Sequence, residues 1–382
     1  MQLGTFFFAR HRPCRNQFNV LLFRSALAPV QHMPRHSHRA TPLVLVLLAT
    51  LALLAGACGK AEQGQAGATV PVTDAAGRVV NVRVNPKRVV TLNKNAAEIL
   101  RMFGVTDRIV GVSDWIPKNP DYWPELAGAR NVGKFNDPDV EAIAELKPDL
   151  VLCYQGSPGP GFEDKMAAAG IQVLRLELYR ISALPRDVEG LGRIFGREDK
   201  AREYLDWLKT RMDEVARRVA ADPVRPDVYI EGYSEFAACG SSSGMHERLL
   251  FAGGRNISEA MQAANSPVSP EWVLERQPWA VVKMSSQNGC YGKDGPGGMV
   301  AQREGLLART GWGKTPAGKA GRVFLMTTDV TSGGASVVGI AWLAKWLHPK
   351  TCADLDPNLW HREFIERFQG RPWRGVYVHP TE

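Results

Sequence analysis

One apolar stripe constrains this chain more than any other feature, because it separates two regions that share a different pattern. The stripe runs at helical spacing through residues 198–219, and charged residues occupy the opposite side of the helix. The apolar residues of the stripe are Ala201, Tyr204, Leu205, Leu208, Met212, Val215 and Val219. Residues 184–195 also carry apolar side chains on one face, and Gly196 interrupts the pattern. The sequence therefore predicts a linking helical segment over residues 184–222.

Short apolar runs alternate with helical patterns on both sides of that segment. Strands are expected at residues 88–92, 109–112, 150–153, 172–176, 228–231, 280–284 and 323–326. Helices are expected at residues 96–103, 140–146 and 162–169, and a helical stretch at 338–368. Strands of this length joined by helices favour parallel sheets covered on both faces. We expect an α/β fold of two Rossmann-like lobes, residues 71–183 and 223–382, joined by one long backbone helix with a ligand cleft between the lobes.

The N-terminal region has the order of a secretory signal. An apolar run at residues 43–54 follows Arg35 and Arg39 and precedes small residues, which is the sequence of basic, apolar and small segments that export requires. The run is shorter than the roughly 20 residues that cross a bilayer. We therefore predict a signal region over residues 1–57, whose true start could be Met33.

The end of this region also resembles the lipobox of bacterial lipoproteins. Leu54-Ala55-Gly56-Ala57-Cys58 carries the resemblance, although Ala55 stands where a leucine is usual. The resemblance implies that Cys58 becomes the lipidated first residue of a protein held outside the cytoplasmic membrane, in the periplasm or at the cell surface. Residues 58–70 then form a flexible tether. Plain secretion is the alternative.

Charge and cysteine spacing exclude some classes of function. The net charge of +8 includes six arginines in residues 1–57, a region without acidic residues, so the remainder carries only +2. No basic run remains to hold phosphate backbones, and nucleic acid is not an expected partner. The cysteines after Cys58 lack the C-x-x-C spacing of zinc sites. The disulfide state of Cys153, Cys239, Cys290 and Cys352 is open. Cys239–Cys290 is one pair that an exported chain could form, whereas Cys153 lies in an apolar run, as a small buried hydrophobic residue does.

Several short motifs, in this order, resemble the siderophore, haem and vitamin B12 binding class of periplasmic proteins, also called TroA-like. They are Val72-Thr73-Asp74-Ala75-Ala76-Gly77-Arg78, Pro86-Lys87-Arg88-Val89-Val90, Glu145-Leu146-Lys147-Pro148-Asp149-Leu150-Val151, Leu249-Leu250-Phe251-Ala252-Gly253-Gly254-Arg255-Asn256-Ile257 and Ser269-Pro270-Glu271-Trp272-Val273-Leu274. The resemblance implies the substrate-binding component of an ABC importer. It also implies a monomer that works with a membrane permease and its ATPase and has no enzymatic activity or resident cofactor.

Ligands of open parallel sheets lie beyond the carboxyl ends of the strands. The residues at those positions are aromatic or polar, which is typical of small-molecule pockets: Asn93, Lys94, Asn95, Asp114, Trp115, Lys134, Phe135, Tyr154, Gln155, Tyr233, Ser234, Ser285, Ser286 and residues 328–333.

The histidines bear on the ligand. His246, His348, His361 and His379 lie away from these loops, so no directly coordinated metal ion is expected. A metal already wrapped in an organic chelate needs no such ligands. We expect an iron–siderophore complex first, with cobalamin, haem or an oxyanion such as molybdate as alternatives.

Two glutamates and one serine motif complete the candidates. The family resemblance assigns Glu163 and Glu271 to docking on arginines of the permease; Glu271 also fits a first helical turn, where the helix dipole favours an acid.

Gly240-Ser241-Ser242-Ser243-Gly244 satisfies the G-x-S-x-G pattern, and Ser242, Asp329 and His348 follow in hydrolase order. A secreted serine hydrolase is therefore an alternative. The expected strand ends too early for a nucleophile elbow, however, and the same loop could simply cap a helix near Met245.

Overall fold

The structure is a computed structural model that describes residues 67–285, 291–293 and 295–381. Ala66–Glu382 forms one unit. The predicted signal region, Cys58 and most of the tether lie outside the described residues. Within the described part of the chain, no helix is both long enough and apolar enough to cross a membrane.

The first sheet is entirely parallel and has the strand order β5-β4-β3-β8-β9. Its strands are β3 (Val89–Thr91), β4 (Ile109–Val112), β5 (Arg130–Asn131), β8 (Leu150–Tyr154) and β9 (Gln172–Leu176). Its helices are α2 (Lys94–Met102), α3 (Val140–Glu145) and α4 (Phe162–Ala168). Smaller elements of this region are the hairpin β1 (Thr69–Thr73) with β2 (Val79–Arg83), the hairpin β6 (Gly133–Lys134) with β7 (Asp137–Pro138), and the turns η1 (Thr106–Arg108) and η2 (Pro124–Leu126).

The second sheet has a parallel centre and antiparallel edges, in the order β13-β11-β10-β14-β15-β16 with β12 also on β10. Its strands are β10 (Asp227–Glu231), β11 (Ala237–Ala238), β12 (Arg255–Asn256), β13 (Ser266–Pro267), β14 (Ala280–Ser285), β15 (Val323–Thr327) and β16 (Val378–His379). Its surrounding helical segments are α7 (Gly244–Phe251), α8 (Pro270–Glu275), α9 (Met299–Leu307), η3 (Trp312–Lys314), α10 (Pro316–Lys319), α11 (Thr328–Thr331), η4 (Gly333–Ala335), α12 (Ser336–Leu347), α13 (Pro357–Glu363) and the π-helical turn η5 (Phe364–Phe368).

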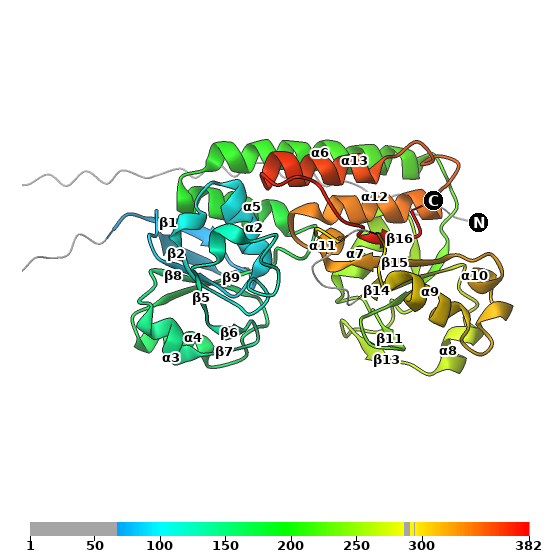
Figure 1. The fold of residues 1–382 in the computed structure, drawn as a ribbon, viewed down its shortest axis with the longest axis horizontal. Coiled ribbons are helices and arrows are strands. Elements are labelled where there is room, and N and C mark those ends of the chain that lie inside the picture. The colour runs from blue at the N-terminus through cyan, green and yellow to red at the C-terminus, as the bar shows by residue number, and fades with distance from the viewer. Residues whose placement is uncertain (1–66, 286–290, 294, 382) are drawn as a thin grey trace, which may run out of the picture. The chain divides into compact units, whose positions relative to one another are not determined.

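The linking segment is two helices rather than one. It divides into α5 (Leu184–Phe195) and the long helix α6 (Glu198–Ala220) because Gly196 adopts a left-handed conformation with φ +61°. There the Arg197 amide bonds to the Gly192 carbonyl at 2.8 Å, which ends α5. The helix α6 runs beside α13 and packs on α12 (Figure 1). The predicted helical stretch 338–368 is likewise split, between α12 and α13.

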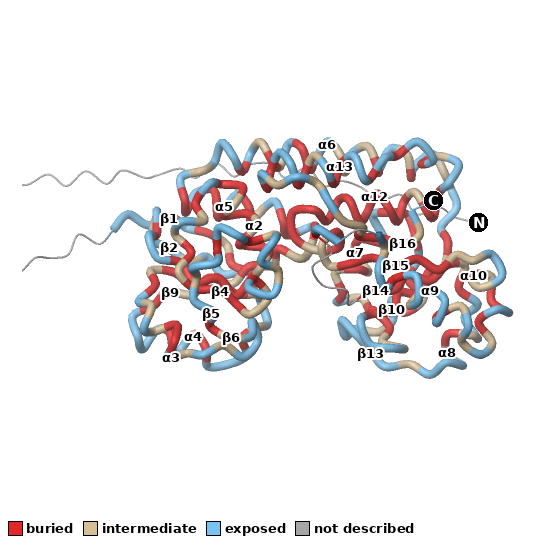
Figure 2. The backbone as a smooth tube through the Cα atoms, in the orientation of Figure 1, coloured by how far each residue is buried: buried red, intermediate tan, exposed pale blue. Residues whose placement is uncertain are grey.

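Burial explains the strands. All residues of β3, β14 and β15 are buried, as parallel strands covered on both faces must be. One continuous core extends from the first sheet through the buried faces of α5, α6 and α12 to the second sheet (Figure 2). The predicted α/β class with parallel sheets is confirmed. The strands of the first sheet fall within residues 71–183 and those of the second within 223–382, while the lobe boundaries themselves stay a prediction.

Candidate ligand-binding site

A cavity of about 580 Å³ lies where loops of both sheets meet. Its described lining is largely aromatic: Leu92, Lys94, Ser113, Trp115, Phe135, Tyr154, Gly156, Ser157, Tyr179, Tyr233 and Thr328. Most of these residues directly follow a strand; Trp115 comes after β4, for example, and Tyr233 after β10. The cavity therefore occupies the position at which open α/β sheets bind ligands.

Aromatic rings form a continuous wall on the first-sheet side of this cavity. Phe135 meets Tyr154 edge-on with ring centroids 5.6 Å apart, and Tyr154 lies 6.3 Å from Tyr179. On the other side, Tyr233 is 47% exposed. Burial raises the pKa of the Tyr154 phenol well above its ordinary value, so this group stays neutral at physiological pH. The wall offers apolar area and hydroxyl groups but no phenolate.

Lys94 brings the only charge into the described lining of this cavity. Its Nζ lies 4.5 Å from the centroid of the Trp115 ring and 4.0 Å from Asp329 Oδ1, and only 15% of its side chain is exposed. The ring and the carboxylate both stabilise the ammonium group. Its positive charge is thus largely balanced by the protein itself.

A second cavity of about 20 Å³, enough for one water molecule, lies beside Lys94 and is lined by Glu98 and His361 among others. Burial raises the pKa of Glu98 to about 7, although the nearby Lys94 acts against the rise. Burial also lowers the pKa of His361 to about 3, so this imidazole is neutral. Glu98 is therefore a group whose charge changes near neutral pH next to the larger cavity.

Comparison with known proteins identifies the family. Residues 89–330 match the family model described as periplasmic binding protein. The chain belongs to the periplasmic binding protein family. An uncharacterized ABC transporter substrate-binding lipoprotein, YvrC of Bacillus subtilis, is 27% identical over 330 residues, covering 80% of this chain and 96% of the relative. The vitamin B12-binding protein of Photorhabdus laumondii is 27% identical over 208 residues, covering 53% of this chain and 72% of the relative.

Solved structures agree on the fold. A TroA-like periplasmic binding protein from Veillonella parvula superposes with a TM-score of 0.68 at 22% identity, covering 81% of this chain and 99% of that chain. The molybdate periplasmic binding protein MolA of Haemophilus influenzae also gives 0.68, at 20% identity, covering 80% of this chain and 100% of that one. The resemblance to the TroA-like class is confirmed, and so is the two-lobed α/β fold.

The structure of this periplasmic binding protein brings some of the predicted site residues together and leaves others outside the cavity. Five of the predicted side chains line it, together with Thr328: Lys94, Trp115, Phe135, Tyr154 and Tyr233. The others in the described chain do not: Asn93, Asn95, Asp114, Lys134, Gln155, Ser234, Ser285 and residues 329–333. Ser286 lies outside the described residues.

Local structure explains several of these exceptions. The Asn93 side chain caps α2 by accepting from the Asn95 and Ala96 amides. Asp114 pairs with Lys118 at 2.5 Å, and Ser285 is buried at the end of β14. A residue that follows a strand can therefore serve the helix or strand beside it instead of the cavity.

Tyr179, Ser113, Leu92, Gly156 and Ser157 line the cavity without having been predicted. Tyr179 was detectable from the sequence, since it closely follows β9, and applying the strand-end rule to all four of the predicted first-lobe strands would have included it.

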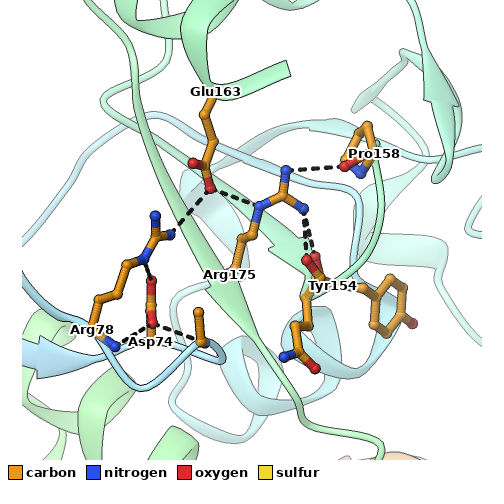
Figure 3. Close-up of polar contacts among 8 residues, drawn as sticks. Asp74, Arg78, Tyr154, Pro158, Glu163 and Arg175 are labelled. Atoms are coloured by element: carbon orange, nitrogen blue, oxygen red, sulfur yellow. Dashed lines mark hydrogen bonds and ion pairs between the residues drawn. The ribbon is translucent and has the colours of Figure 1, made fainter. Parts of the chain in front are cut away.

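The two predicted docking glutamates differ in their surroundings. Glu271 is exposed in the first turn of α8 and makes no ion pair with a described residue. Glu163 is 38% exposed and bonds Arg175 Nε at 2.6 Å, with Arg78 at 3.5 Å (Figure 3). Arg175 in turn donates to the carbonyls of Tyr154 and Pro158, both at 3.0 Å. Glu163 is therefore linked to the cavity wall indirectly, because its partner Arg175 bonds the backbone of Tyr154, which lines the cavity.

The hydrolase alternative fails on geometry. His348 is buried, and its ring nitrogens bond Asp222 Oδ2 and the Ala252 carbonyl, both at 3.1 Å. The Ser242 hydroxyl bonds the Gln262 carbonyl instead of a histidine. The neighbouring Ser243 caps α7, which matches the expectation that the loop caps a helix near Met245.

The remaining candidates for metal or redox chemistry are isolated. No cluster of three or more His, Cys, Asp or Glu side chains suited to a metal ion occurs in the described residues. Cys153, Cys239 and Cys352 are buried free thiols, and Cys290 falls outside the described chain.

Proposed function

We propose that this protein is the extracytoplasmic substrate-binding component of an ABC importer and captures a metal chelate in the aromatic cavity. The single observation that supports this most strongly is that side chains from strand-end loops of both lobes meet around one apolar cavity. Membership of the periplasmic binding protein family and the likeness to a relative named as an ABC transporter substrate-binding lipoprotein support the same role.

The charge of the cavity favours a chelate with little net charge. Lys94 is the one charged side chain in the described lining, and Asp329 and Trp115 already balance it. A molybdate ion or a highly anionic ferric catecholate would need several uncompensated donors or cations. Broad aromatic faces suit a large organic ligand instead.

Cobalamin fits this description best. Its corrin presents a wide apolar face and its charges cancel within the molecule, and relatives named as vitamin B12-binding and cobalamin-binding proteins are 27% and 29% identical to this chain. The iron–siderophore expectation is retained as the second candidate for neutral complexes, such as ferric hydroxamates. In these complexes three singly charged ligand groups cancel the charge of the ferric ion.

The location and partners are part of the proposal. A lipid on Cys58 would hold the protein at the outer face of the cytoplasmic membrane, where it delivers its ligand to a permease driven by an ATPase. Cleavage at a residue other than Cys58, or a Cys58→Ser protein that stays on the membrane as before, would refute the anchor. Glu163 and Glu271 would dock the monomer on permease arginines.

A titration of tryptophan fluorescence tests the ligand class, since Trp115 lines the cavity. The full chain, purified in detergent, would be titrated with cyanocobalamin, ferrichrome, ferric enterobactin, haem and molybdate. We expect saturable quenching by cyanocobalamin at the lowest concentration, then by the neutral ferrichrome. Tightest binding of molybdate or ferric enterobactin would contradict the charge argument.

Uptake tests the docking role, and Glu271 gives the clearer result because it makes no contact with the cavity. Glu271→Arg should leave cyanocobalamin affinity unchanged and sharply reduce uptake, since like charges would face the permease. The double variant Glu163→Arg, Glu271→Arg should abolish uptake, but its affinity will also fall because Glu163 holds Arg175. Normal uptake by the double variant would refute the docking assignment.

A further inference from the structure

A third cavity, of about 190 Å³, adjoins the aromatic one on the side of the second lobe. The two cavities share Tyr179, Tyr233 and Thr328 in their linings. A ligand seated against the aromatic wall can therefore extend one substituent past Tyr233 into this side cavity.

Arg248 of α7 lines the side cavity and is 1% exposed. Its Nη2 donates to the Ser336 hydroxyl at 3.1 Å and to the Tyr179 carbonyl, while its buried Nε has no hydrogen-bond partner. No carboxylate of the described chain forms an ion pair with it. A guanidinium group in this situation is costly, because a buried charge normally needs both an opposite charge and a full set of acceptors.

Two further observations point to a missing partner for Arg248. Burial lowers its pKa to about 10, although the nearby carboxylate of Glu247 acts against the fall. The Thr328 hydroxyl, which lines both cavities, is buried and also without a partner. A cation and a hydroxyl, both unsatisfied, thus border the same small space.

We propose that the side cavity binds a single anionic oxygen group of the ligand, a phosphoryl or carboxylate group, through Arg248 with Thr328 as a second donor. The proposal rests on the proposed function, since it treats this group as one arm of the chelate in the aromatic cavity. Arginine binds such groups with directional, charge-assisted hydrogen bonds. A ligand of low net charge with one anionic arm satisfies both cavities, and the phosphodiester of cobalamin is such an arm.

Discrimination between two corrinoids tests the subsite. Cyanocobalamin carries the phosphodiester and dicyanocobinamide lacks it, while both present the corrin face. In the full chain we expect cyanocobalamin to bind about tenfold or more tightly than cobinamide, the scale of one charge-assisted hydrogen bond. Arg248→Met should remove most of this preference and leave cobinamide affinity nearly unchanged. Arg248→Lys should retain part of it because the charge remains.

Arg322→Met is the matched control. Arg322, like Arg248, forms no ion pair with a described residue; it bonds the carbonyls of Trp279 and Pro316 and lies outside the described linings of both cavities. This variant should keep the wild-type preference. If Arg248→Met weakens both corrinoids equally, or if wild type does not discriminate between them, the subsite assignment is wrong and Arg248 only supports Tyr179 and Ser336.

A second experiment, which uses simple anions in place of a chelate, tests the side cavity independently of the identity of the ligand. Phosphate or acetate, added at constant ionic strength, should raise the melting temperature of wild type by about 2 °C or more and leave Arg248→Met unchanged. Stabilisation by phosphate alone would indicate a phosphoryl arm, and by acetate alone a carboxylate arm. If phosphate stabilises the protein but neither corrinoid binds, the subsite stands and the proposed ligand fails. No stabilisation of wild type by either anion would overturn the subsite.

Discussion

Two loops that border the cavity, one in each lobe, are held by the same device with a different cation. The carbonyls at 154, 155 and 158 accept from Arg175 on β9, and those at 232–234 accept from Lys283 on β14. Each cation pairs with a glutamate, Glu163 in the first lobe and Glu231 in the second. Loops at strand ends leave carbonyls without ladder partners, and a cation on the next strand satisfies several at once.

The difference lies in the access of solvent to these glutamates. Glu231 is fully buried and also bonds Arg309 at 2.7 Å, whereas Glu163 is 38% exposed. Burial acts to raise the pKa of Glu231, but the bonds from Arg309 and Lys283 outweigh it and hold the pKa below its ordinary value. The second loop is therefore fixed by a sealed network, and the first by one that solvent or a partner can reach.

The largest effect is expected from breaking the sealed network. Lys283→Met leaves three carbonyls without their donor and removes one of two cations from a buried carboxylate, so it should cost about 3 kcal/mol or more of unfolding free energy. Denaturant unfolding measures this loss. Lys118→Met, which breaks an exposed pair with Asp114, is the control and should cost less than about 1 kcal/mol. Equal costs for both variants would show that the buried network is not special.

The aromatic wall should matter for ligand affinity more than for stability. Trp115→Ala and Tyr154→Ala should each weaken cyanocobalamin binding about ten- to a hundredfold, because each removes roughly 1.5–3 kcal/mol of apolar contact. Isothermal titration calorimetry measures the change. Trp272→Ala, which removes a ring of α8 that packs against the C-cap residue Arg276, should bind normally. If neither cavity variant weakens binding, the ligand lies elsewhere.

The dependence of stability on pH should show that Glu98 behaves oppositely to Glu231, because the pKa of Glu98 is raised in the folded protein and that of Glu231 is lowered. The folded pKa of Glu98, about 7, exceeds its ordinary value, so folding favours the protonated carboxyl. Its contribution to stability is therefore present at low pH and lost as pH rises from about 4.5 to 7. Glu98→Gln should be more stable than wild type at pH 8, by about 1–3 kcal/mol, and equal to it near pH 4. A difference that does not vary with pH would refute this assignment.

The smallest effect on stability is expected at the accessible counterion. Glu163→Gln should cost less than about 1 kcal/mol in unfolding but lower cyanocobalamin affinity about two- to fivefold, because Arg175 then holds the loop less firmly. Hydrogen exchange at the Ser157 amide, which bonds the Tyr154 carbonyl at 3.4 Å, should also quicken. Asp164→Asn removes a neighbouring charge from the same first turn of α4 and should change neither quantity. If Glu163→Gln and Asp164→Asn give the same ligand affinity and the same exchange rate at Ser157, Glu163 does not help to hold the first loop.

The sequence predicted the central strands β3, β4, β8, β9, β10, β14 and β15, but not the short edge strands and hairpins, and it predicted four of the five aromatic residues of the described cavity lining. Both successes follow simple rules. Buried parallel strands are short apolar runs, and residues after such runs, including Trp115, Tyr154 and Tyr233, line the cavity. The same rule fails at Asn93, because its side chain caps α2 and does not line the cavity. The two cations that hold the loops are visible in the sequence, since Arg175 and Lys283 are lone charges inside apolar strands. Arg248 could not be predicted from the sequence, because only the folded structure shows that its buried Nε has no hydrogen-bond partner.

Native mass spectrometry of the full chain, released in detergent from its own membranes and mixed with equimolar cyanocobalamin, ferrichrome and molybdate, tests the central claim most directly. We expect one adduct with the mass of a neutral chelate on wild type, cyanocobalamin first, and its loss from Trp115→Ala. A molybdate adduct, no adduct at all, or a chelate that Trp115→Ala retains in full would contradict it.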